Sequence, residues 1–211
     1  YREYVFDQDT FTYEKAGTTE VYADLPFTPA FTMSIAAVQL SDQDNVMYDT
    51  NADGIADAFT GFDAINNGPE VRYGRVVGDH ITASGLEPMN ITLTAQYWKE
   101  QSSIQGFAVN TQHHTNGTCN FPVTVSYYTS TNNLENQGSI AASEVGFTAP
   151  TPWVEGMSNF NVVDPTDTTQ GPGDDLNGRV PMTINVPDYL QYDFNGDGTY
   201  DNPKASATIG K

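Results

Sequence analysis

The chain has 211 residues, which suits one large β domain or two small ones, and 38% of them are hydrophobic and 12% aromatic. This apolar content is too high for a disordered chain, so a sizeable core can form. With 27 acidic and 8 basic residues, the formal net charge of −19 disfavours nucleic acid and anionic membranes as partners and favours cations. The charge is also consistent with a protein that stays soluble in salty water.

A single cysteine, Cys119, cannot form an internal disulfide, so no disulfide framework holds this fold. Metal ions that clip backbone segments together are an alternative device for an extracellular protein. No apolar run is long enough to cross a membrane. Because the chain begins with Tyr1 and carries no signal peptide, we expect a mature fragment or an excised part of something longer.

Alternating apolar and polar residues predict half-buried β-strands. In chain order they cover residues 31–35, 71–77, 89–97, 121–127 and 180–186, the second and the last with a weaker pattern. Helical spacing of apolar residues is everywhere broken by Gly, Pro or Thr. We therefore predict an all-β fold, with antiparallel sheets stacked as a β-sandwich.

Turn-rich segments separate these strands, and the run Asn-Asn-Gly-Pro at residues 66–69 is the best candidate for a boundary. We expect an N-terminal β subdomain at residues 1–66 and a C-terminal β-sandwich subdomain at residues 67–211. The sequence leaves open whether these are two packed Ig-like subdomains or one continuous domain.

Two short segments share the pattern D-x-N-x-D-G-x-x-D: DTNADGIAD at residues 49–57 and DFNGDGTYD at residues 193–201. Calcium takes six to eight oxygen ligands. A loop around one ion presents side-chain oxygens at positions 1, 3 and 5, a glycine at 6, a carbonyl at 7 and a carboxylate at 9. The predicted Ca²⁺ ligands of the first loop are Asp49, Asn51, Asp53, the carbonyl of Ile55, and Asp57. Those of the second loop are Asp193, Asn195, Asp197, the carbonyl of Thr199, and Asp201.

Neither loop has the bidentate Glu of an EF-hand at position 12, where Thr60 and Lys204 stand. A remaining ligand must come from elsewhere in the fold or be water. The loops are more similar to those of dockerins and thrombospondin-type repeats than to a regulatory EF-hand. An Asp- and Asn-rich turn without metal is the alternative, but clustered carboxylates repel one another without a cation. We expect both loops to clip strand ends, with a stabilising rather than a signalling role.

Other candidate sites have weaker patterns. His113 and His114 precede Cys119, but neighbouring residues on a strand point to opposite faces, so we expect an exposed turn and no metal there. Trp98, on the face opposite Tyr97, could stack on sugar rings, although packing in the core is the favoured role of the tryptophans. No nucleophile elbow, zinc-protease motif or phosphate-binding loop is present, so we expect no enzyme.

Several segments together resemble one known family. They are the R-x-G-R run of Arg72, Gly74 and Arg75, the strand end QYW at residues 96–98, the stretch from Asn110 to Cys119, and the closing DFNGDG loop. In order and spacing, the chain from Phe11 onward resembles the C-terminal uncharacterised domain of MshQ-like surface proteins. These are large proteins of Gram-negative bacteria, and MshQ is encoded with the mannose-sensitive haemagglutinin (MSHA) pilus.

The resemblance implies a β-rich fold, export, association with pili or adhesin-like proteins, and no enzymatic activity. We therefore expect a non-catalytic, calcium-stabilised module at the surface of a Gram-negative bacterium, with other surface or pilus subunits or cell-surface glycans as partners. Two alternatives stay open: a carbohydrate-binding module of a polysaccharide-active protein, and a fibre subunit that self-associates through exposed strand edges. The loop at residues 49–57 is not a feature of the family and rests on its spacing alone.

Overall fold

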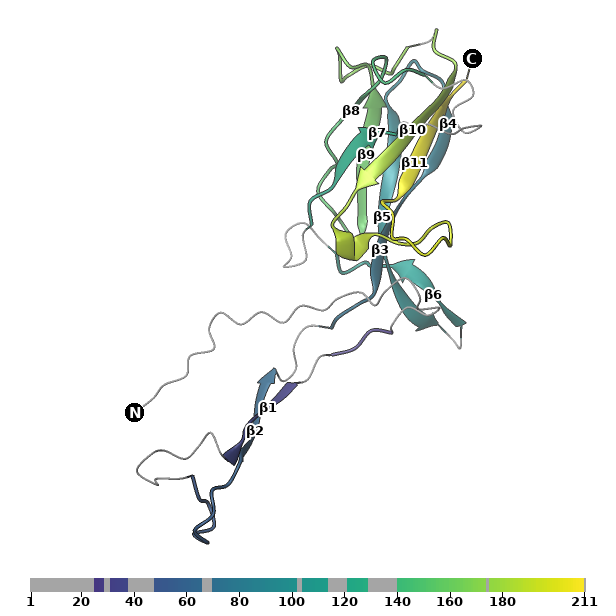
Figure 1. The fold of residues 1–211 in the computed structure, drawn as a ribbon. Helices are drawn as coiled ribbons and strands as arrows, with labels where there is room; N and C mark the ends of the chain where they lie inside the picture. Colours follow the sequence, from purple (N-terminus) through teal and green to yellow (C-terminus); the bar gives the residue numbers. More distant parts are fainter. Residues whose placement is uncertain are drawn as a thin grey trace. The chain divides into compact units, whose positions relative to one another are not determined.

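The computed structural model describes residues 25–28, 31–37, 48–65, 70–101, 104–113, 121–128, 140–173 and 175–210. They fall into two compact units, a smaller one at Leu25–Arg72 and a larger one that contains Tyr73–Lys211 (Figure 1). The predicted boundary at residues 66–69, His114 and Cys119 lie outside the described residues. In the described part, no helix is long and apolar enough to span a membrane.

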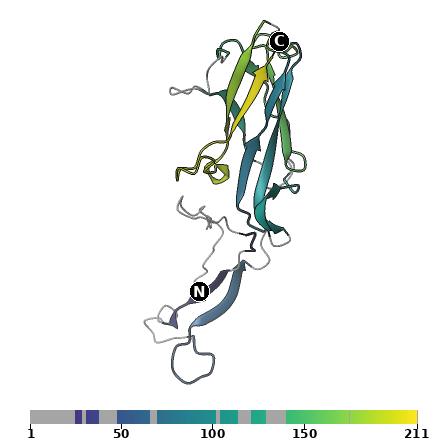
Figure 2. The ribbon, with the colours of Figure 1, turned by 90° about the vertical axis from the view of Figure 1, so that its right-hand side faces the viewer.

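The smaller unit is built on a two-stranded antiparallel sheet (Figure 2). Strand β1 (Phe31–Ile35) pairs with β2 (Phe59–Ile65), and an isolated bridge joins Phe27 to Val71. The first Asp-rich loop lies between the strands and ends just before β2. Because an isolated two-stranded sheet is marginally stable in water, this unit depends on interactions beyond its strand pairing.

The larger unit is a sandwich of two sheets with the orders β4-β11-β10-β7 and β3-β5-β9-β8, and β6 pairs with β5 (Figure 1). Its elements are β3 (Gly74–Gly78), β4 (His80–Ala83), β5 (Met89–Gln101), β6 (Ile104–Val109), β7 (Thr124–Tyr127), β8 (Gly146–Phe147), β9 (Met157–Val163), β10 (Gly178–Asn185), the 3₁₀ helix η3 (Asp188–Leu190) and β11 (Lys204–Ile209). The predicted all-β sandwich is confirmed.

The strand order of the larger unit is that of an Ig-like sandwich. Strands β3, β5, β9 and β8 take the places of A, B, E and D, and β7, β10 and β11 those of C, F and G. The first strand is divided between the sheets: β3 pairs antiparallel with β5, and β4 then runs parallel to β11. The β6 pairing extends β5 beyond β9, because β6 pairs with residues 96–101 and β9 with residues 89–94.

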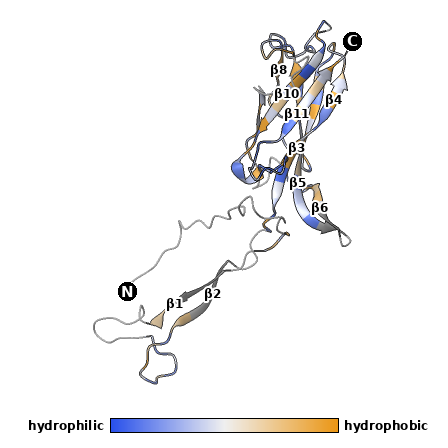
Figure 3. Ribbon diagram, turned by 45° about the vertical axis from the view of Figure 1, so that its right-hand side comes forward, coloured by the Kyte–Doolittle hydropathy of each residue, from blue (hydrophilic) through white to orange (hydrophobic). Residues whose placement is uncertain are grey.

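The hydrophobic core lies between the two sheets, and apolar residues alternate with polar ones along its strands (Figure 3). On β5, Ile91 and Leu93 are fully buried, as the alternation predicts. Facing strands contribute Met182 and Ile184 from β10 and Ile209 from β11, all fully buried. Each such side chain stabilises the fold by about 1.5–3 kcal/mol relative to an exposed one.

Candidate metal centres

The first Asp-rich loop folds around the acidic side chain at its start. The carboxylate of Asp49 accepts hydrogen bonds from the backbone N–H groups of Asp53 at 3.3 Å and Gly54 at 2.8 Å. Asn51 bonds to Asp53 twice: its Oδ1 accepts the backbone N–H at 3.0 Å, and its Nδ2 donates to Oδ2 at 3.0 Å. The Oδ1 of Asp53 accepts the N–H of Ile55 at 2.8 Å. The predicted ligands at positions 1, 3 and 5 thus share one hydrogen-bonded turn.

The second loop repeats this arrangement position by position. The carboxylate of Asp193 accepts the backbone N–H groups of Asp197 at 3.1 Å and Gly198 at 2.9 Å. Asn195 makes the same two bonds to Asp197, at 3.2 Å from the backbone N–H and at 2.9 Å to Oδ2. The Oδ1 of Asp197 accepts the N–H of Thr199 at 2.8 Å. Two segments far apart in the chain therefore form the same local structure.

Left-handed backbone at positions 4 and 6 turns both loops sharply. The φ angles are +59° at Ala52 and +83° at Gly54, and +73° at Gly196 and +86° at Gly198. Nothing lies within 4 Å of a Cβ built on Gly54 or Gly196, so the left-handed conformation, not lack of space, favours glycine at these positions. Ala52 adopts the same conformation at a cost of about 1–2 kcal/mol.

Both loops are closed at their base, but they differ at the last predicted ligand. The N–H of Asp57 donates to the carbonyl of Tyr48 at 2.7 Å, and Asp201 and Tyr192 exchange two backbone bonds of 3.1 and 3.2 Å. The carboxylate of Asp57 accepts the hydroxyl and the backbone N–H of Thr50, and both bonds lower the pKa of this carboxyl. Among the described residues, none donates to the carboxylate of Asp201, which lines a pocket. Asp201 is therefore open to an external partner.

The two sets of oxygens suit a hard cation, although the carboxylates bond to backbone N–H groups in this conformation. No group of three His, Cys, Asp or Glu side chains in the described ranges stands close enough together to hold a metal ion. A carboxylate oxygen that accepts one N–H keeps a second lone pair, so the carboxylates of Asp53 and Asp197 retain acceptor capacity for a cation. The hydrogen bonds from the backbone N–H of Thr199 and from the amide of Asn195 lower the pKa of Asp197.

An arginine and three aromatic rings pack together at the second loop, and we call them the Arg75 cluster: Arg75, Phe107, Tyr192 and, from within the loop, Phe194. The guanidinium carbon of Arg75 is 3.6 Å from the ring centroid of Phe107, 4.9 Å from that of Tyr192 and 5.8 Å from that of Phe194. Its Nε donates to Oε1 of Gln96 at 2.9 Å. Burial lowers the pKa of Arg75, yet the group stays charged. The cluster fastens the second loop to β3 and β6.

The predicted roles of the histidine and tryptophan side chains need correction in one case. His113 follows an exposed turn at residues 111–112, but its side chain is 2% exposed and stacks on Phe121 at 4.4 Å, so the predicted exposure is wrong for His113. Trp153 is buried in the core beside it, as the favoured interpretation of the tryptophans predicts. Trp98 is half-buried and packs edge-on against Phe107 at 5.1 Å. Neither indole forms an exposed platform for sugar rings.

The spacing predicted the turns of both loops, whereas sequence reasoning missed the Arg75 cluster. Arg75 entered only as part of the R-x-G-R run, and nothing local connects it to Phe107 or Tyr192. The alternation of apolar residues in β3 and β5 and the aromatic residues before and inside the second loop were the available signals. These residues can be assigned to one cluster only when the pairing of β5 with β3 and β6 is known.

A comparison with known proteins assigns the sandwich to a domain family. The family model described as DUF6701, fourth domain, matches residues 72–211, which is more than half of the chain. The match includes every strand of the larger unit and the second Asp-rich loop, and it excludes the first loop. Searches of curated proteins and of solved structures each found no match. The chain therefore belongs to the DUF6701 family, and its residues 72–211 form the family's fourth domain.

Proposed function

We propose that the chain is a non-catalytic, calcium-stabilised β module of an extracellular bacterial surface protein. One observation carries the proposal: two copies of D-x-N-x-D-G-x-x-D fold into the same hydrogen-bonded turn. Calcium bound to the five predicted oxygens of each loop would fasten the ends of the loop together. The module's work is structural or adhesive.

The residues that the two loops share support calcium over a bare turn. Both loops have Asp at positions 1, 5 and 9, Asn at position 3 and Gly at position 6, and they differ at positions 2, 4, 7 and 8. The shared positions are those that supply side-chain ligands or the sharp turn, while position 7 contributes only a carbonyl. In the first loop, Thr50 bonds to the carboxylate at position 9, whereas in the second loop no described residue donates to the carboxylate of Asp201, so hydrogen bonds within the turn do not account for an acidic residue there.

The absence of a disulfide in the sandwich fits this role. Antibody-type Ig domains join strands B and F by a disulfide, but the corresponding β5 and β10 contain no cysteine. The second loop connects β10 through η3 to β11. Calcium at this loop would link the end of the F strand to the start of the G strand.

Cell-surface location is supported by calcium chemistry and by resemblance. Extracellular modules bind calcium with Kd values of roughly 10⁻⁴–10⁻³ M, which suits loops with five protein ligands and no bidentate Glu. The resemblance to MshQ-like proteins favours a pilus- or filament-associated protein of a Gram-negative bacterium. Its partners would be other surface or pilus subunits or cell-surface glycans.

Thermal unfolding with and without calcium tests this proposal. Calcium at 100 times Kd stabilises a protein by about 2.7 kcal/mol per site, which raises the Tm of a chain of this size by roughly 5–10 °C. Magnesium at equal ionic strength serves as the control for screening of the net charge. Superimposable melts in calcium and in excess chelator, from protein first shown to be metal-free, would refute the proposal.

A further inference from the structure

The two Asp-rich loops differ at position 4, directly after the asparagine that both of them contain. The second loop has Asn195-Gly196, and the first has Asn51-Ala52. Asparagine is a thermolabile residue, because the backbone nitrogen of the next residue can attack the carbonyl carbon of its side chain. Glycine in the next position favours this attack, since no Cβ hinders the approach and the backbone can adopt more conformations. The second loop therefore contains the reactive dipeptide, and the first contains a hindered counterpart in the same turn.

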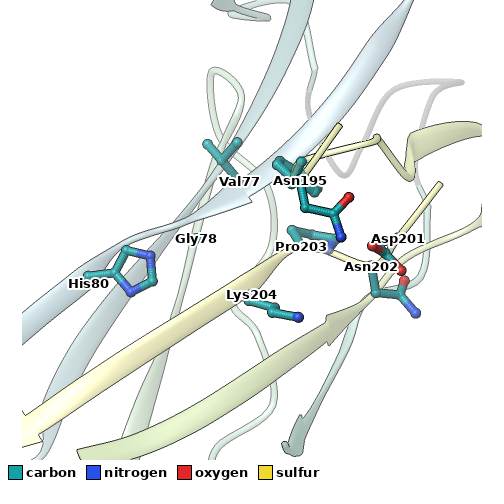
Figure 4. Close-up of a pocket in the computed structure, with 9 residues that line it drawn as sticks. Val77, Gly78, His80, Asn195, Asp201, Asn202, Pro203 and Lys204 are labelled. Atoms are coloured by element: carbon teal, nitrogen blue, oxygen red, sulfur yellow. The ribbon is translucent and has the colours of Figure 1, made fainter. Parts of the chain in front are cut away.

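Asn195 and Gly196 are open to solvent. Both residues are exposed, and nothing lies within 4 Å of a Cβ built on Gly196. A pocket of about 270 Å³ lies beside the loop, and Asn195 and Asp201 line it together with His80 and Lys204 of the four-stranded sheet (Figure 4). Water therefore has access to the side chain of Asn195.

Two hydrogen bonds of the second loop involve the atoms that take part in such an attack. The backbone N–H of Gly196 donates to Oδ1 of Asp193 at 2.7 Å. Oδ1 of Asn195 accepts the backbone N–H of Asp197 at 3.2 Å. A carboxylate next to the N–H of a nucleophile can accept its proton, and an N–H next to a carbonyl oxygen stabilises the negative charge that develops there. The turn thus gives the attacking nitrogen a proton acceptor and the attacked carbonyl a hydrogen-bond donor.

The first loop lacks one of these contacts. The carboxylate of Asp49 accepts the backbone N–H groups of Asp53 and Gly54. In the described part of the chain, no hydrogen bond joins the N–H of Ala52 to this carboxylate. The methyl group of Ala52 also lies beside the nitrogen that would attack Asn51. Asn51 is therefore an internal reference for Asn195.

We infer that Asn195 is a site of spontaneous modification, at which the side-chain amide is converted to a carboxylate. The nitrogen of Gly196 bonds to the side-chain carbonyl carbon of Asn195, and its proton passes by way of Asp193 to the amide nitrogen. This nitrogen leaves as ammonia, so one C–N bond forms, another breaks and a cyclic succinimide remains. Water then opens the ring at either carbonyl and leaves aspartate or isoaspartate, with no atom oxidised or reduced.

Either product changes the candidate calcium site, and this consequence rests on the proposed function. Aspartate at position 3 brings a carboxylate to the place where Nδ2 of Asn195 donates to Oδ2 of Asp197 at 2.9 Å. The two carboxylates repel one another unless a cation lies between them, so the loop then depends more strongly on calcium. Isoaspartate adds a methylene group to the backbone, which changes the spacing of the ligands and weakens calcium binding.

Incubation of the whole chain in excess chelator at neutral pH, followed by peptide mapping with mass spectrometry, tests the inference. We expect Asn195 to lose its amide at least about tenfold faster than Asn51, because a Cβ follows Asn51 and none follows Asn195. Peptide mapping distinguishes Asn195 from the other Asn-Gly pairs of the chain, at residues 67–68, 116–117 and 177–178. Equal rates at Asn195 and Asn51 would overturn the inference.

Reciprocal substitutions in the two loops sharpen this test. Gly196→Ala should slow the reaction at Asn195 at least about tenfold, and the turn accommodates alanine there as it does at Ala52, with φ of +59°. Ala52→Gly should accelerate the loss of the amide at Asn51. Asp193→Asn keeps an acceptor oxygen but not the charge, and should slow the reaction at Asn195 about tenfold. An unchanged rate in Gly196→Ala would overturn the inference, and an unchanged rate in Asp193→Asn would overturn the role of Asp193.

A calcium titration of the same protein keeps this inference apart from the proposed function. If the chain binds calcium but Asn195 keeps its amide as long as Asn51 does, the inference is overturned and the proposed function stands. If Asn195 is converted and the chain takes up no calcium, the modification is supported and the proposed function is overturned.

Discussion

The two Asp-rich loops have the same local geometry, but they are attached to different structures. The first connects the strands of a two-stranded sheet, while the second connects β10 to β11 in a sandwich with a fully buried core. The second loop also packs against Arg75 and Phe107 through Tyr192. The comparison shows that spacing within nine residues determines the turn, whereas the surrounding fold determines which packing contacts support it.

Position 2 accounts for a further difference between the loops. Thr50 in the first loop bonds to the carboxylate of Asp57, while Phe194 in the second packs edge-on against Tyr192 at 5.3 Å. The first loop therefore satisfies its last carboxylate internally. In the second loop, the residue at position 2 is Phe194, which belongs to the Arg75 cluster. The carboxylate of Asp201 has no donor among the described residues and lines the pocket.

The largest expected effect is the loss of the smaller unit on calcium removal. A two-stranded sheet alone is marginal, so excess chelator should abolish amide-exchange protection in β1 and β2 while β5 and β10 stay protected. Hydrogen exchange with mass spectrometry measures both units in one sample. Equal loss of protection in the two units, or no loss in either, would contradict the expectation that only the smaller unit depends on calcium.

Arg75→Ala should destabilise the larger unit by about 2–3 kcal/mol. It removes cation–π contacts of about 0.5–2 kcal/mol and leaves a cavity between Phe107 and Tyr192. Arg179→Ala on β10 is the control, for which a change below about 0.5 kcal/mol is expected. Urea unfolding measures the free energy of unfolding of each variant. An equal loss in the two variants would exclude a special role of the cluster.

Asp197→Ala should lower the Tm in calcium by several degrees, because it removes the carboxylate at position 5 and the acceptor of the Thr199 N–H. Asp175→Ala, an exposed acidic residue outside both loops, should change it little. In excess chelator the difference between the variants should shrink. A difference in Tm of the same size with and without calcium would show that Asp197 stabilises the turn without a metal ion.

Thr50→Val should have the smallest effect. The two bonds from Thr50 hold the pKa of Asp57 below its usual range, and the valine variant keeps only the backbone N–H. Since the folded pKa is depressed, this contribution to stability is present above the unfolded pKa and is lost as the pH falls through the folded pKa. Carboxyl NMR titration should show a higher pKa of Asp57 in the variant. An unchanged value would mean that the hydroxyl does not bond to this carboxylate.

Local pattern predicted the sandwich strands unevenly. Alternation identified β5, where apolar residues face the core in strict order, but it missed β9 and β11. In β9, Ser158 is buried among apolar neighbours because its hydroxyl bonds to the carbonyl of Thr151 at 2.6 Å. In β11 the buried positions include Ala205 and Ala207, whose small side chains give a weak apolar signal.

The candidate site was likewise predicted only in part from the sequence. Side-chain bonds within each loop span at most seven residues, so the spacing of Asp and Asn was sufficient to predict the turns. The Arg75 cluster and the pocket combine residues from β3, β4, β6 and β11 with the second loop. Their formation depends on the division of the first strand between two sheets, which no local pattern reveals.

A crystal structure of the chain grown in millimolar calcium, with anomalous difference maps, tests the central claim most directly. We predict two calcium peaks, one within about 2.3–2.6 Å of oxygens of Asp49, Asn51 and Asp53 and one equally close to those of Asp193, Asn195 and Asp197. Difference maps without a peak in either loop, with the carboxylates still bonded to backbone N–H groups, would contradict it.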